Sequence, residues 1–258
     1  MDCLSLKEDW VFNMKGIILA GGLATRLRPL TFVTNKHLLP IYNKPMIFYP
    51  IEAMKSAGIK EVLIVTGPSH AGAFLNLLKN GSEFGLQFTY EIQQEAGGIA
   101  HGIALGESFA DGEKLLVVLG DNIFNVDLKK DAEEFSKKEK GAIVYGVKAD
   151  TKSGQYGVIE MDDQGKVLSI EEKPENPKSE IAQTGIYMYD HRVFDFIRKQ
   201  SPSARGELEV SSLNNYYVEE KSLTCNMLDW WVDAGTSFDE LLRANNLVAE
   251  KVKQGELA

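Results

Sequence analysis

The stretch from residue 15 to residue 40, KGIILAGGLATRLRPLTFVTNKHLLP, constrains the possible fold of this chain more than any other. Residues 16–20 are small or apolar and do not alternate with polar residues, which is typical of a strand buried on both faces in a parallel sheet. Gly21 and Gly22 follow directly. Without a Cβ atom, they allow the chain to turn sharply and a ligand to approach the backbone. The stretch therefore predicts a buried strand that ends in a ligand-accessible turn.

Three cations, Arg26, Arg28 and Lys36, lie in the loop after these glycines. Backbone amides and cations just past the carboxyl end of a buried strand indicate a phosphate-binding site in an open α/β sheet. A plain turn is the alternative interpretation, because glycine pairs are common in turns. The best-known phosphate-loop motifs do not fit: the chain lacks GxxxxGK[ST], and Ala24 and Leu27 stand where GxGxxG requires glycine.

The composition excludes several functional classes. With 258 residues, of which 44% are hydrophobic and 25% charged, the chain can bury a substantial core and has the composition of a soluble globular protein. Its 37 acidic and 28 basic residues give a net charge of −9, which provides no electrostatic surface for nucleic acid or an anionic membrane. Cys3 and Cys225 lack metal-site spacing, so we expect a reducing, cytoplasmic location. Residues 1–13 lack an apolar core and predict an N-terminal extension rather than a signal peptide.

Helix and strand patterns alternate through the first half of the chain. An alternation of this kind predicts a Rossmann-like α/β fold, a mostly parallel sheet with helices on both faces. The last of these strands runs into Asp121, which places a carboxylate at the same edge of the sheet as Gly21. The expected helices lie at residues 46–57 and 71–79, and the expected strands at 61–65, 86–92 and 114–119.

The second half of the chain changes character. Residues 129–140 carry charges of both signs, and we interpret them as the solvated face of a helix. Polar turns then join three predicted strands, and the turn at residues 162–165 is typical of a hairpin. A last helix is expected at 237–253. The three strands are expected at 141–147, 156–161 and 167–172.

The string from residue 15 to residue 40 resembles the signature of the sugar-1-phosphate nucleotidyltransferases, GGxGTRLxPxT followed by KxLLP. It is most similar to the signature of the glucose-1-phosphate thymidylyltransferases. Three later segments, 170–174, 183–187 and 202–209, match the same family. The resemblance implies the nucleotide-diphospho-sugar transferase fold over most of the chain.

This fold implies a single domain at residues 14–258. Residues 14–140 are expected to form its nucleotide-binding half. Residues 141–258 are expected to form a β-rich, sugar-binding layer on the edge of the same sheet rather than an independent domain.

The resemblance also implies a nucleotide site. Gln93 and Gly98 match the side chain and the backbone that read the polar edge of a pyrimidine in the family, and a solvent turn is the alternative. His37 stands where many members have glutamine, and we interpret it as a nucleotide contact rather than a residue that only supports the loop. Ala24 replaces a glycine, so the backbone there must avoid positive φ or bear strain. The implied nucleotide-binding residues are Leu19, Gly21, Gly22, Ala24, Thr25, Arg26, Lys36, His37, Gln93, Gly98 and Asp121.

A sugar-phosphate site is implied in the second half. A carboxylate next to an ammonium, as in Glu172 and Lys173, can bind sugar hydroxyls and a phosphate, although the residues alone also fit a surface ion pair. Gln183 replaces a frequent valine and is expected to contribute mainly its backbone. Trp230 and Trp231 are interpreted as core or as a wall of the sugar site. The implied sugar-phosphate-binding residues are Asn122, Tyr156, Gly157, Glu172, Lys173, Gln183, Tyr187 and Arg205.

Asp121 and Asp233 match the metal-binding aspartates of the family and imply a Mg²⁺ cofactor, since magnesium prefers oxygen ligands. The implied reaction joins a nucleoside triphosphate to glucose-1-phosphate and releases pyrophosphate. The attacking phosphate oxygen is already anionic, so no Ser, Cys or His nucleophile is needed. Arg26 and Lys36, catalytic together with Asp121, would neutralise the triphosphate and the leaving group.

We expect dTTP as the nucleotide. The alternatives are a UTP-dependent uridylyltransferase acting on the same sugar phosphate and a non-catalytic nucleotide-binding regulatory subunit. Long-form thymidylyltransferases continue past the helix that is expected here at 237–253, so a second, regulatory nucleotide site is not expected. We expect a homo-oligomer that associates through surfaces of the main domain and has no nucleic-acid or membrane partner.

Overall fold

The computed structural model describes residues 14–22 and 24–257. The predicted N-terminal extension, residues 1–13, lies outside these described residues. One nine-stranded sheet forms the centre of the protein. Its strands are β1 (Met14–Ala20), β4 (Glu61–Thr66), β5 (Gln87–Ile92), β6 (Lys114–Leu119), β8 (Ala142–Lys148), β9 (Gly157–Met161), β10 (Val167–Glu172), β11 (Ile181–Tyr189) and β12 (Leu223–Met227).

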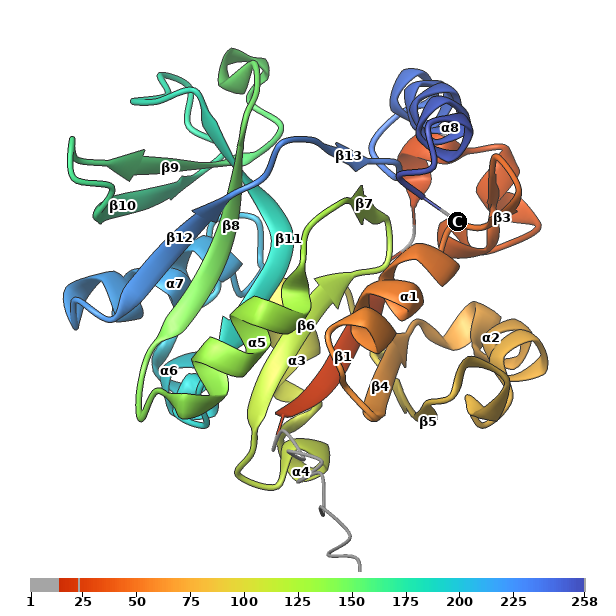
Figure 1. The fold of residues 1–258 in the computed structure, drawn as a ribbon, viewed down its shortest axis with the longest axis horizontal. Helices are drawn as coiled ribbons and strands as arrows, with labels where there is room; N and C mark the ends of the chain where they lie inside the picture. Colours follow the sequence, from red (N-terminus) through yellow and green to blue (C-terminus); the bar gives the residue numbers. More distant parts are fainter. Residues whose placement is uncertain (1–13, 23, 258) are drawn as a thin grey trace, which may run out of the picture.

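Helices cover both faces of this sheet (Figure 1), which confirms the predicted α/β class. Within the described residues, no helix combines the length and the apolar character that crossing a membrane requires. The helices are α1 (Phe48–Ser56), α2 (Ala71–Leu78), α3 (Ile99–Ala104), α4 (Glu107–Ala110), α5 (Leu128–Lys137), α6 (Val193–Lys199), α7 (Val210–Glu219) and α8 (Phe238–Lys253).

The parallel part of the sheet has the order β6-β1-β4-β5, with β1 between its two neighbours. The apolar run of β1 is buried on both faces, as its lack of alternation predicts. Ile18 packs with residues of α1, α2 and α5 on one face, and Ile17 packs with residues of α3, α6 and α7 on the other. Because β1 and β6 are parallel, their carboxyl ends lie at the same edge of the sheet. Apolar clusters on both faces hold this part of the sheet in place.

The second half of the chain extends the same sheet with mostly antiparallel pairs. β11 pairs antiparallel with β6 and with β8, and β9 and β10 form the predicted hairpin. The turn of this hairpin is closed by a 2.9 Å hydrogen bond from Gly165 N to Asp162 O. The strands β11 and β12 and the helices α6 and α7 were not predicted as elements. Parts of the sugar-side layer therefore come from segments that lack a clear periodic pattern.

Two short strands complete the edge of the sheet at which β1 and β6 end. β7 (Asn122–Phe124) follows β6 closely and pairs antiparallel with β13 (Trp231–Asp233). Ile123 and Val232 pack with Ala244 and Val248 of α8 in a separate apolar cluster. This cluster holds the C-terminal helix over the ends of the central strands, as Figure 1 shows at the upper right.

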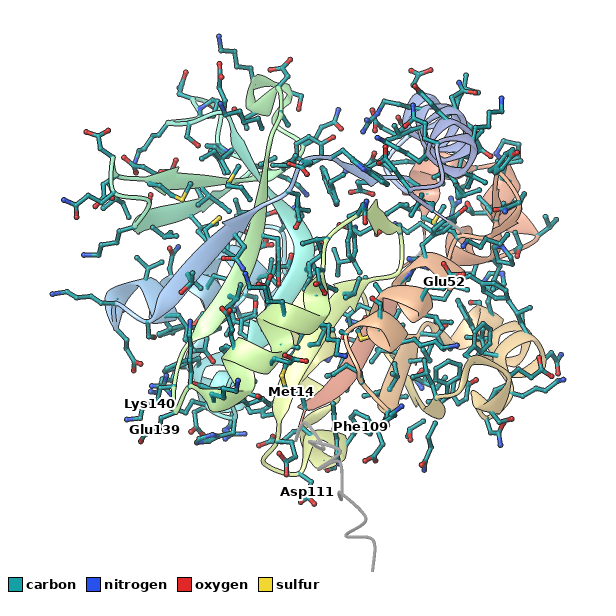
Figure 2. The ribbon with its side chains drawn as sticks, viewed as in Figure 1. Met14, Glu52, Phe109, Asp111, Glu139 and Lys140 are labelled. Carbon is teal, nitrogen blue, oxygen red and sulfur yellow. The ribbon has the colours of Figure 1, made fainter. Side chains whose placement is uncertain are left out.

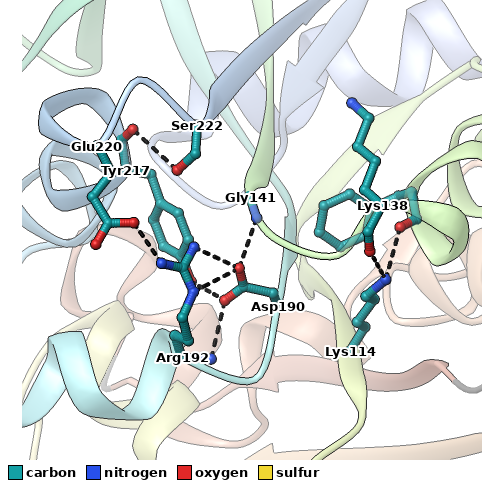
Figure 3. Close-up of polar contacts among 9 residues, drawn as sticks. Lys114, Lys138, Gly141, Asp190, Arg192, Tyr217, Glu220 and Ser222 are labelled. Atoms are coloured by element: carbon teal, nitrogen blue, oxygen red, sulfur yellow. Dashed lines mark hydrogen bonds and ion pairs between the residues drawn. The ribbon is translucent and has the colours of Figure 1, made fainter.

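A buried ion network lies at the opposite end of the sheet (Figure 3). Asp190 follows β11 and is fully buried. Its carboxylate accepts hydrogen bonds from Gly141 N at 2.7 Å and from the guanidinium of Arg192 at 2.8 Å. Arg192 also contacts Glu220 at 2.5 Å. Met14, at the start of β1, lies at this end as well (Figure 2), so the network stabilises the fold away from the candidate site.

Candidate active site

The glycine loop after β1 brings the backbone against a neighbouring side chain. A Cβ atom at Gly21 would lie 2.8 Å from Oε1 of Gln93, so glycine is needed for this contact. Gly22 has φ of +92°, and Ala24 has φ of +46°. The sequence left two possibilities for Ala24, a backbone that avoids positive φ or one that bears strain, and the structure shows the second. The left-handed conformation costs a residue with a Cβ atom about 1–2 kcal/mol. Thr25 and Arg26 follow as exposed residues on the outer side of the loop.

Asn35 fixes the segment that carries Lys36. Its Oδ1 accepts a 2.9 Å hydrogen bond from His37 N, and its Nδ2 donates to Ala20 O, the last residue of β1, at 3.4 Å. A short 3-10 helix, Lys36–Leu38, begins directly after it. Asn35 thus holds Lys36 against the carboxyl end of β1. The sequence prediction missed this role, although asparagine before a short helix is a recognised capping signal.

His37 is buried beneath the loop, and its Nδ1 lies 2.7 Å from Oδ1 of Asn35. Burial, together with the charge of Lys36, lowers the pKa of His37 to about 3. The imidazole is therefore neutral, with Nδ1–H donating to Asn35. The ring also lines the cavity described below. His37 therefore supports the loop through Asn35, and it is also placed where it could contact a nucleotide.

Asp121 and Asp233 come together through the β7–β13 pair. Asp233 pairs with Asn122 in the strand register, and Ala234 N donates to Asp121 O at 2.9 Å. The Asp121 carboxylate also forms an ion pair with the ammonium of Lys36. A Cβ atom at Gly235 would lie 2.3 Å from Asp121 Oδ2 and 2.6 Å from Lys36 Nζ, so only glycine leaves room for this cluster.

The charges in this acid–ammonium cluster shift the pKa values of the two carboxyl groups in opposite directions. The attraction of Lys36 outweighs burial and lowers the pKa of Asp121 below its usual range. Burial, and then the negative charge on Asp121, raise the pKa of Asp233. Burial acts to lower the pKa of Lys36, but the charges of Asp121 and Asp233 outweigh it and raise the pKa. The site therefore concentrates negative charge around a single ammonium group.

The donor set of this cluster fits a magnesium ion. Two carboxylates, Asp121 and Asp233, lie within hydrogen-bonding reach of each other and provide hard oxygen ligands. In the part of the chain that the structure describes, no group of three or more His, Cys, Asp and Glu side chains is placed to hold a metal. One or two carboxylates are the usual protein share of a magnesium site, because substrate phosphates and water complete it.

A cavity of about 270 Å³ opens beside this cluster, below the glycine loop. Gln93 closes one side, and its Nε2 donates to Gly98 O at 3.3 Å. Gly98 has φ of +94°, and a Cβ atom there would lie 2.6 Å from Leu208 O, so the loop is clamped to the second half of the chain. The predicted nucleotide-binding residues that line this cavity are Leu19, Gly21, Gly22, Lys36, His37, Gln93, Gly98 and Asp121.

A larger cavity of about 510 Å³ continues from the glycine loop on its other side. Ala24 lines it, together with Arg28 and residues 67–70 that follow β4. The latter segment was not predicted as part of the site. Thr25 and Arg26 do not line either of these two cavities. The positive charge of Arg26 acts to lower the pKa of Lys36, against the larger effects of Asp121 and Asp233.

A third cavity, of about 130 Å³, lies on the sugar side. One wall is formed by Trp231, whose ring meets Tyr156 edge-on at a centroid distance of 5.3 Å. Trp231 is therefore a wall residue, as expected, while Trp230 packs against the α8 cluster. The predicted sugar-phosphate-binding residues that line this cavity are Asn122, Tyr156, Gly157, Glu172, Lys173, Gln183 and Tyr187.

Arg205 lies beside this cavity and is held by glutamates. Its guanidinium contacts Glu209 at 2.7 Å and Glu172 at 3.3 Å. Ser211 donates a 3.0 Å hydrogen bond to the other oxygen of Glu172. The predicted neighbours Glu172 and Lys173 also form an ion pair, at 3.6 Å. Glu209 and Ser211 were not predicted, and their role in orienting Glu172 and Arg205 depends on α7, which the sequence did not reveal.

A family model described as Nucleotidyl transferase matches residues 15–251. This match covers most of the chain, and it agrees with the parallel sheet, the glycine loop and the acid cluster at the carboxyl ends of the strands. The chain therefore belongs to the nucleotidyl transferase family.

Within this family the chain belongs with the glucose-1-phosphate thymidylyltransferases, as the resemblance predicted. It is 43% identical over 227 residues to a glucose-1-phosphate thymidylyltransferase of Neisseria gonorrhoeae, a match of 86% of this chain and 78% of that protein. The relative with the same name in Mycolicibacterium smegmatis is 41% identical over 248 residues, covering 94% of this chain and 85% of the relative.

Two solved structures share the fold. A structure described as a glucose-1-phosphate thymidylyltransferase from Bacillus anthracis, in complex with sucrose, has a TM-score of 0.86 and 46% sequence identity. The match covers 91% of this chain and 94% of that one. A UDP-glucose pyrophosphorylase in complex with UDP-glucose has a TM-score of 0.81 and 25% identity, covering 92% and 99% of the two chains.

Proposed function

We propose that this protein transfers a thymidylyl group from dTTP to glucose-1-phosphate and produces dTDP-glucose and pyrophosphate. The observation that carries this proposal is the position of the acid cluster between two cavities. Asp121 lines the cavity below the glycine loop, and Asp233 lines the sugar-side cavity. A phosphorus atom held at this junction can be reached by an oxygen from the sugar side. The names of the relatives from Neisseria gonorrhoeae and Mycolicibacterium smegmatis support the same substrates.

The proposed reaction is an in-line displacement at the α-phosphorus. An oxygen of glucose-1-phosphate forms the new P–O bond, and the bond to the β-phosphate breaks as pyrophosphate leaves. The attacking oxygen is already anionic, so no residue has to remove a proton from it. The main barrier is repulsion between two polyanions, which fixed cations lower by stabilising the charge of the transition state. Lys36 is held at the junction for this role, and Arg26 at the loop is proposed to stabilise the leaving pyrophosphate.

Asp121 and Asp233 are proposed to hold Mg²⁺, which would offset phosphate charge when bound. The protein contributes the fixed geometry of these ligands. The amide of Asn122 orients the Asp121 carboxylate through a 3.0 Å hydrogen bond, and Gly235 leaves the space that the cluster occupies. Ligands held in this way pay little reorganisation energy during the reaction.

The two halves of the domain are proposed to divide the substrates. Residues 14–140 would bind the nucleotide, with Gln93 and the backbone of Gly98 reading the base. Residues 141–258 would bind the sugar phosphate, with Lys173 and Arg205 contacting its phosphate. We further propose a cytoplasmic homo-oligomer. Exposed apolar side chains on α8, Phe238 at 47% and Leu242 at 61% exposure, offer an apolar surface for association.

A panel of triphosphates tests the proposal against its alternatives. Purified protein is mixed with glucose-1-phosphate, Mg²⁺ and dTTP, UTP, dCTP or ATP, and pyrophosphate release is followed. We expect the highest kcat/KM with dTTP. A clear preference for UTP would identify a uridylyltransferase instead. Nucleotide binding without pyrophosphate release from any triphosphate would identify a non-catalytic binding subunit.

A further inference from the structure

Gln183 carries a buried amide group that the protein does not satisfy. The residue lies in β11, and its exposed fraction is 7%. Neither Nε2 nor Oε1 has a hydrogen-bond partner among residues 14–22 and 24–257, although the hydroxyl of Tyr187 is close enough to interact with the amide. A buried polar atom without a partner destabilises a folded protein, so such groups are rare, and a functional role or a bound ion or water is the usual explanation. The packing of the core alone therefore does not account for a glutamine here.

The unpartnered amide belongs to the sugar-side cavity. Three other described residues, Gln200, Asn214 and Trp230, also have a buried side-chain atom without a partner. Of these four described residues only Gln183 lines the sugar-side cavity. Gly157 lies against it, and a Cβ atom there would be 3.0 Å from Gln183 Oε1. Because Gly157 has no side chain, the space next to the amide stays open to a ligand.

The chemistry next to Gln183 favours a hydroxyl group over a phosphate. The Glu172 carboxylate borders the same space, since its Oε2 would be 3.6 Å from a Cβ atom at Gly157. A negative charge at this position repels an anion. A phosphate could also accept only from Nε2 and would leave Oε1 unpaired. A hydroxyl group both donates and accepts, so one hydroxyl, or two adjacent ones on a sugar ring, can satisfy both atoms of the amide.

Two other polar side chains of this cavity, Asn122 and Glu172, already have partners within the protein. Asn122 Oδ1 accepts from Gly185 N and Trp231 Nε1. Glu172 accepts from Ser211 and pairs with Arg205. Unlike Asn122 and Glu172, Gln183 has free capacity as both donor and acceptor among the described residues.

We propose that the side-chain amide of Gln183 hydrogen-bonds a ring hydroxyl of the sugar phosphate and selects for sugars that carry this hydroxyl. This assignment goes beyond a backbone contact from β11, and it rests on the proposed function for the class of substrate. A site built to hydrogen-bond a hydroxyl discriminates against an analogue that lacks it, because its buried polar atoms are then left unpaired. Gln183 is therefore a specificity-determining residue.

The test combines protein variants with substrate analogues. Wild type, Gln183→Met and Gln183→Leu are assayed by pyrophosphate release with dTTP and with glucose-1-phosphate or its 2-, 3-, 4- or 6-deoxy analogue. In wild type, we expect kcat/KM to fall about tenfold or more for at least one analogue through loss of the contact with Gln183. In both variants this particular loss should disappear, while losses at the other positions stay. Gln183→Asn, which keeps a shorter amide, should retain part of the discrimination.

Gln200→Met serves as the matched control. Gln200 also has a buried, unpartnered amide oxygen, but it does not line the sugar-side cavity. This variant should keep the wild-type pattern of losses across the analogues. The melting temperature of Gln183→Met should not fall below that of wild type, because the substitution removes an unsatisfied buried group of similar size.

Two results would overturn the proposal. The first is a wild type that uses every deoxy analogue as well as glucose-1-phosphate. The second is a Gln183→Met variant with the wild-type pattern of losses, or with equal losses at every position, which would indicate a packing role. Absence of pyrophosphate release from wild type would count against the proposed function instead. In that case the same proteins and analogues are compared by calorimetric binding, where the predicted pattern in affinity is unchanged.

Discussion

The indole Nε1 of Trp231 donates a 2.5 Å hydrogen bond to Oδ1 of Asn122. The same oxygen accepts from Gly185 N at 2.8 Å, while Nδ2 of Asn122 donates to Asp121 at 3.0 Å. One fully buried amide thus links β7, β11 and β13 to the carboxylate at the centre of the site. Asn122 also lines the sugar-side cavity, and its contact with the sugar phosphate stays a prediction. From its hydrogen bonds we infer a second role, the positioning of Asp121.

Replacing Asn122 by Ala should affect both stability and turnover. Two buried N–H groups lose their acceptor, and each unpaired group costs about 1–3 kcal/mol, so the free energy of unfolding should fall measurably in urea titrations. The Asp121 carboxylate also loses its orienting donor, so a higher Mg²⁺ concentration should be needed for half-maximal rate. Trp231→Phe removes one donor and keeps the oxygen, and it should shift the Mg²⁺ requirement less. If Asn122→Ala needed no more Mg²⁺ than wild type for half-maximal rate, Asn122 would not position Asp121.

Asp121→Asn and Asp233→Asn should each lower kcat by a factor of about a hundred or more, because a group that acts on the charge of the transition state is lost. Circular dichroism should show an intact fold for both variants. The control is Asp163→Asn, in the exposed hairpin turn between β9 and β10, which should turn over at the wild-type rate. Near-normal turnover of either site variant at saturating Mg²⁺ would contradict the metal assignment.

Arg26→Ala should lower kcat more than it raises the KM for glucose-1-phosphate. Charge on the departing pyrophosphate grows as the P–O bond breaks, so a cation at the loop acts mainly in the transition state. Arg198→Ala, on the outer surface of α6, is the matched arginine control and should leave both constants unchanged. If only the KM for glucose-1-phosphate changed in Arg26→Ala, the guanidinium would belong to the sugar site.

His37 should make stability depend on pH. Its pKa is lowered from 6.5 to about 3 in the folded protein by burial and by Lys36. The unfolded chain therefore binds the proton first as the pH falls. The stabilisation is present above pH 6.5 and is lost progressively toward pH 3, with a slope of about 1.4 kcal/mol per pH unit.

The substitution His37→Gln should remove the contribution of His37 to this slope between about pH 6.5 and pH 5, where most carboxyl groups titrate little. Asp233, whose raised pKa places its titration near this range, is present in both proteins, so the difference between them isolates His37. The free energy of unfolding from urea titrations at several pH values measures the slope. His191→Gln, at an exposed histidine, should keep the wild-type slope. An unchanged slope in His37→Gln would show that the ring is not held neutral by the fold.

Ala24→Gly should stabilise the protein by about 0.5–1 kcal/mol. Ala24 has φ of +46°, which costs a residue with a Cβ about 1–2 kcal/mol, whereas glycine adopts this conformation freely but loses more chain entropy on folding. The same substitution in a helix, Ala53→Gly in α1, should instead destabilise by about 1 kcal/mol. A lower melting temperature for Ala24→Gly would show that the methyl group makes a contact that outweighs the strain.

The parts of the fold with a strong local pattern could be predicted from the sequence. The unbroken apolar runs of β1 and β6 predicted buried parallel strands, and their shared direction placed Gly21 and Asp121 at one edge. Parallel strands end together at one edge, so this prediction needed no knowledge of distant contacts. The hairpin of β9 and β10 was equally local, because its turn residues indicated it.

Other features depend on contacts between distant segments and gave no such signal. β7 and β13 are short, and their pairing, which brings Asp233 to Asp121, is set by packing against α8. The space that Gly235 leaves at the acid cluster is visible only once this pairing exists. The unpartnered amide of Gln183 is similar: the sequence shows a glutamine, but only the packing of Gly157 against it shows that its donors and acceptor are free.

The most direct test of the central claim is to identify the product. Wild type is incubated with dTTP, glucose-1-phosphate and Mg²⁺. The nucleotide products are then separated by chromatography and identified by mass spectrometry. We expect dTDP-glucose and pyrophosphate in equal amounts, and almost none of either from Asp121→Asn under the same conditions. Detection of bound dTTP without any nucleotide sugar from wild type, or equal product from Asp121→Asn, would contradict the account.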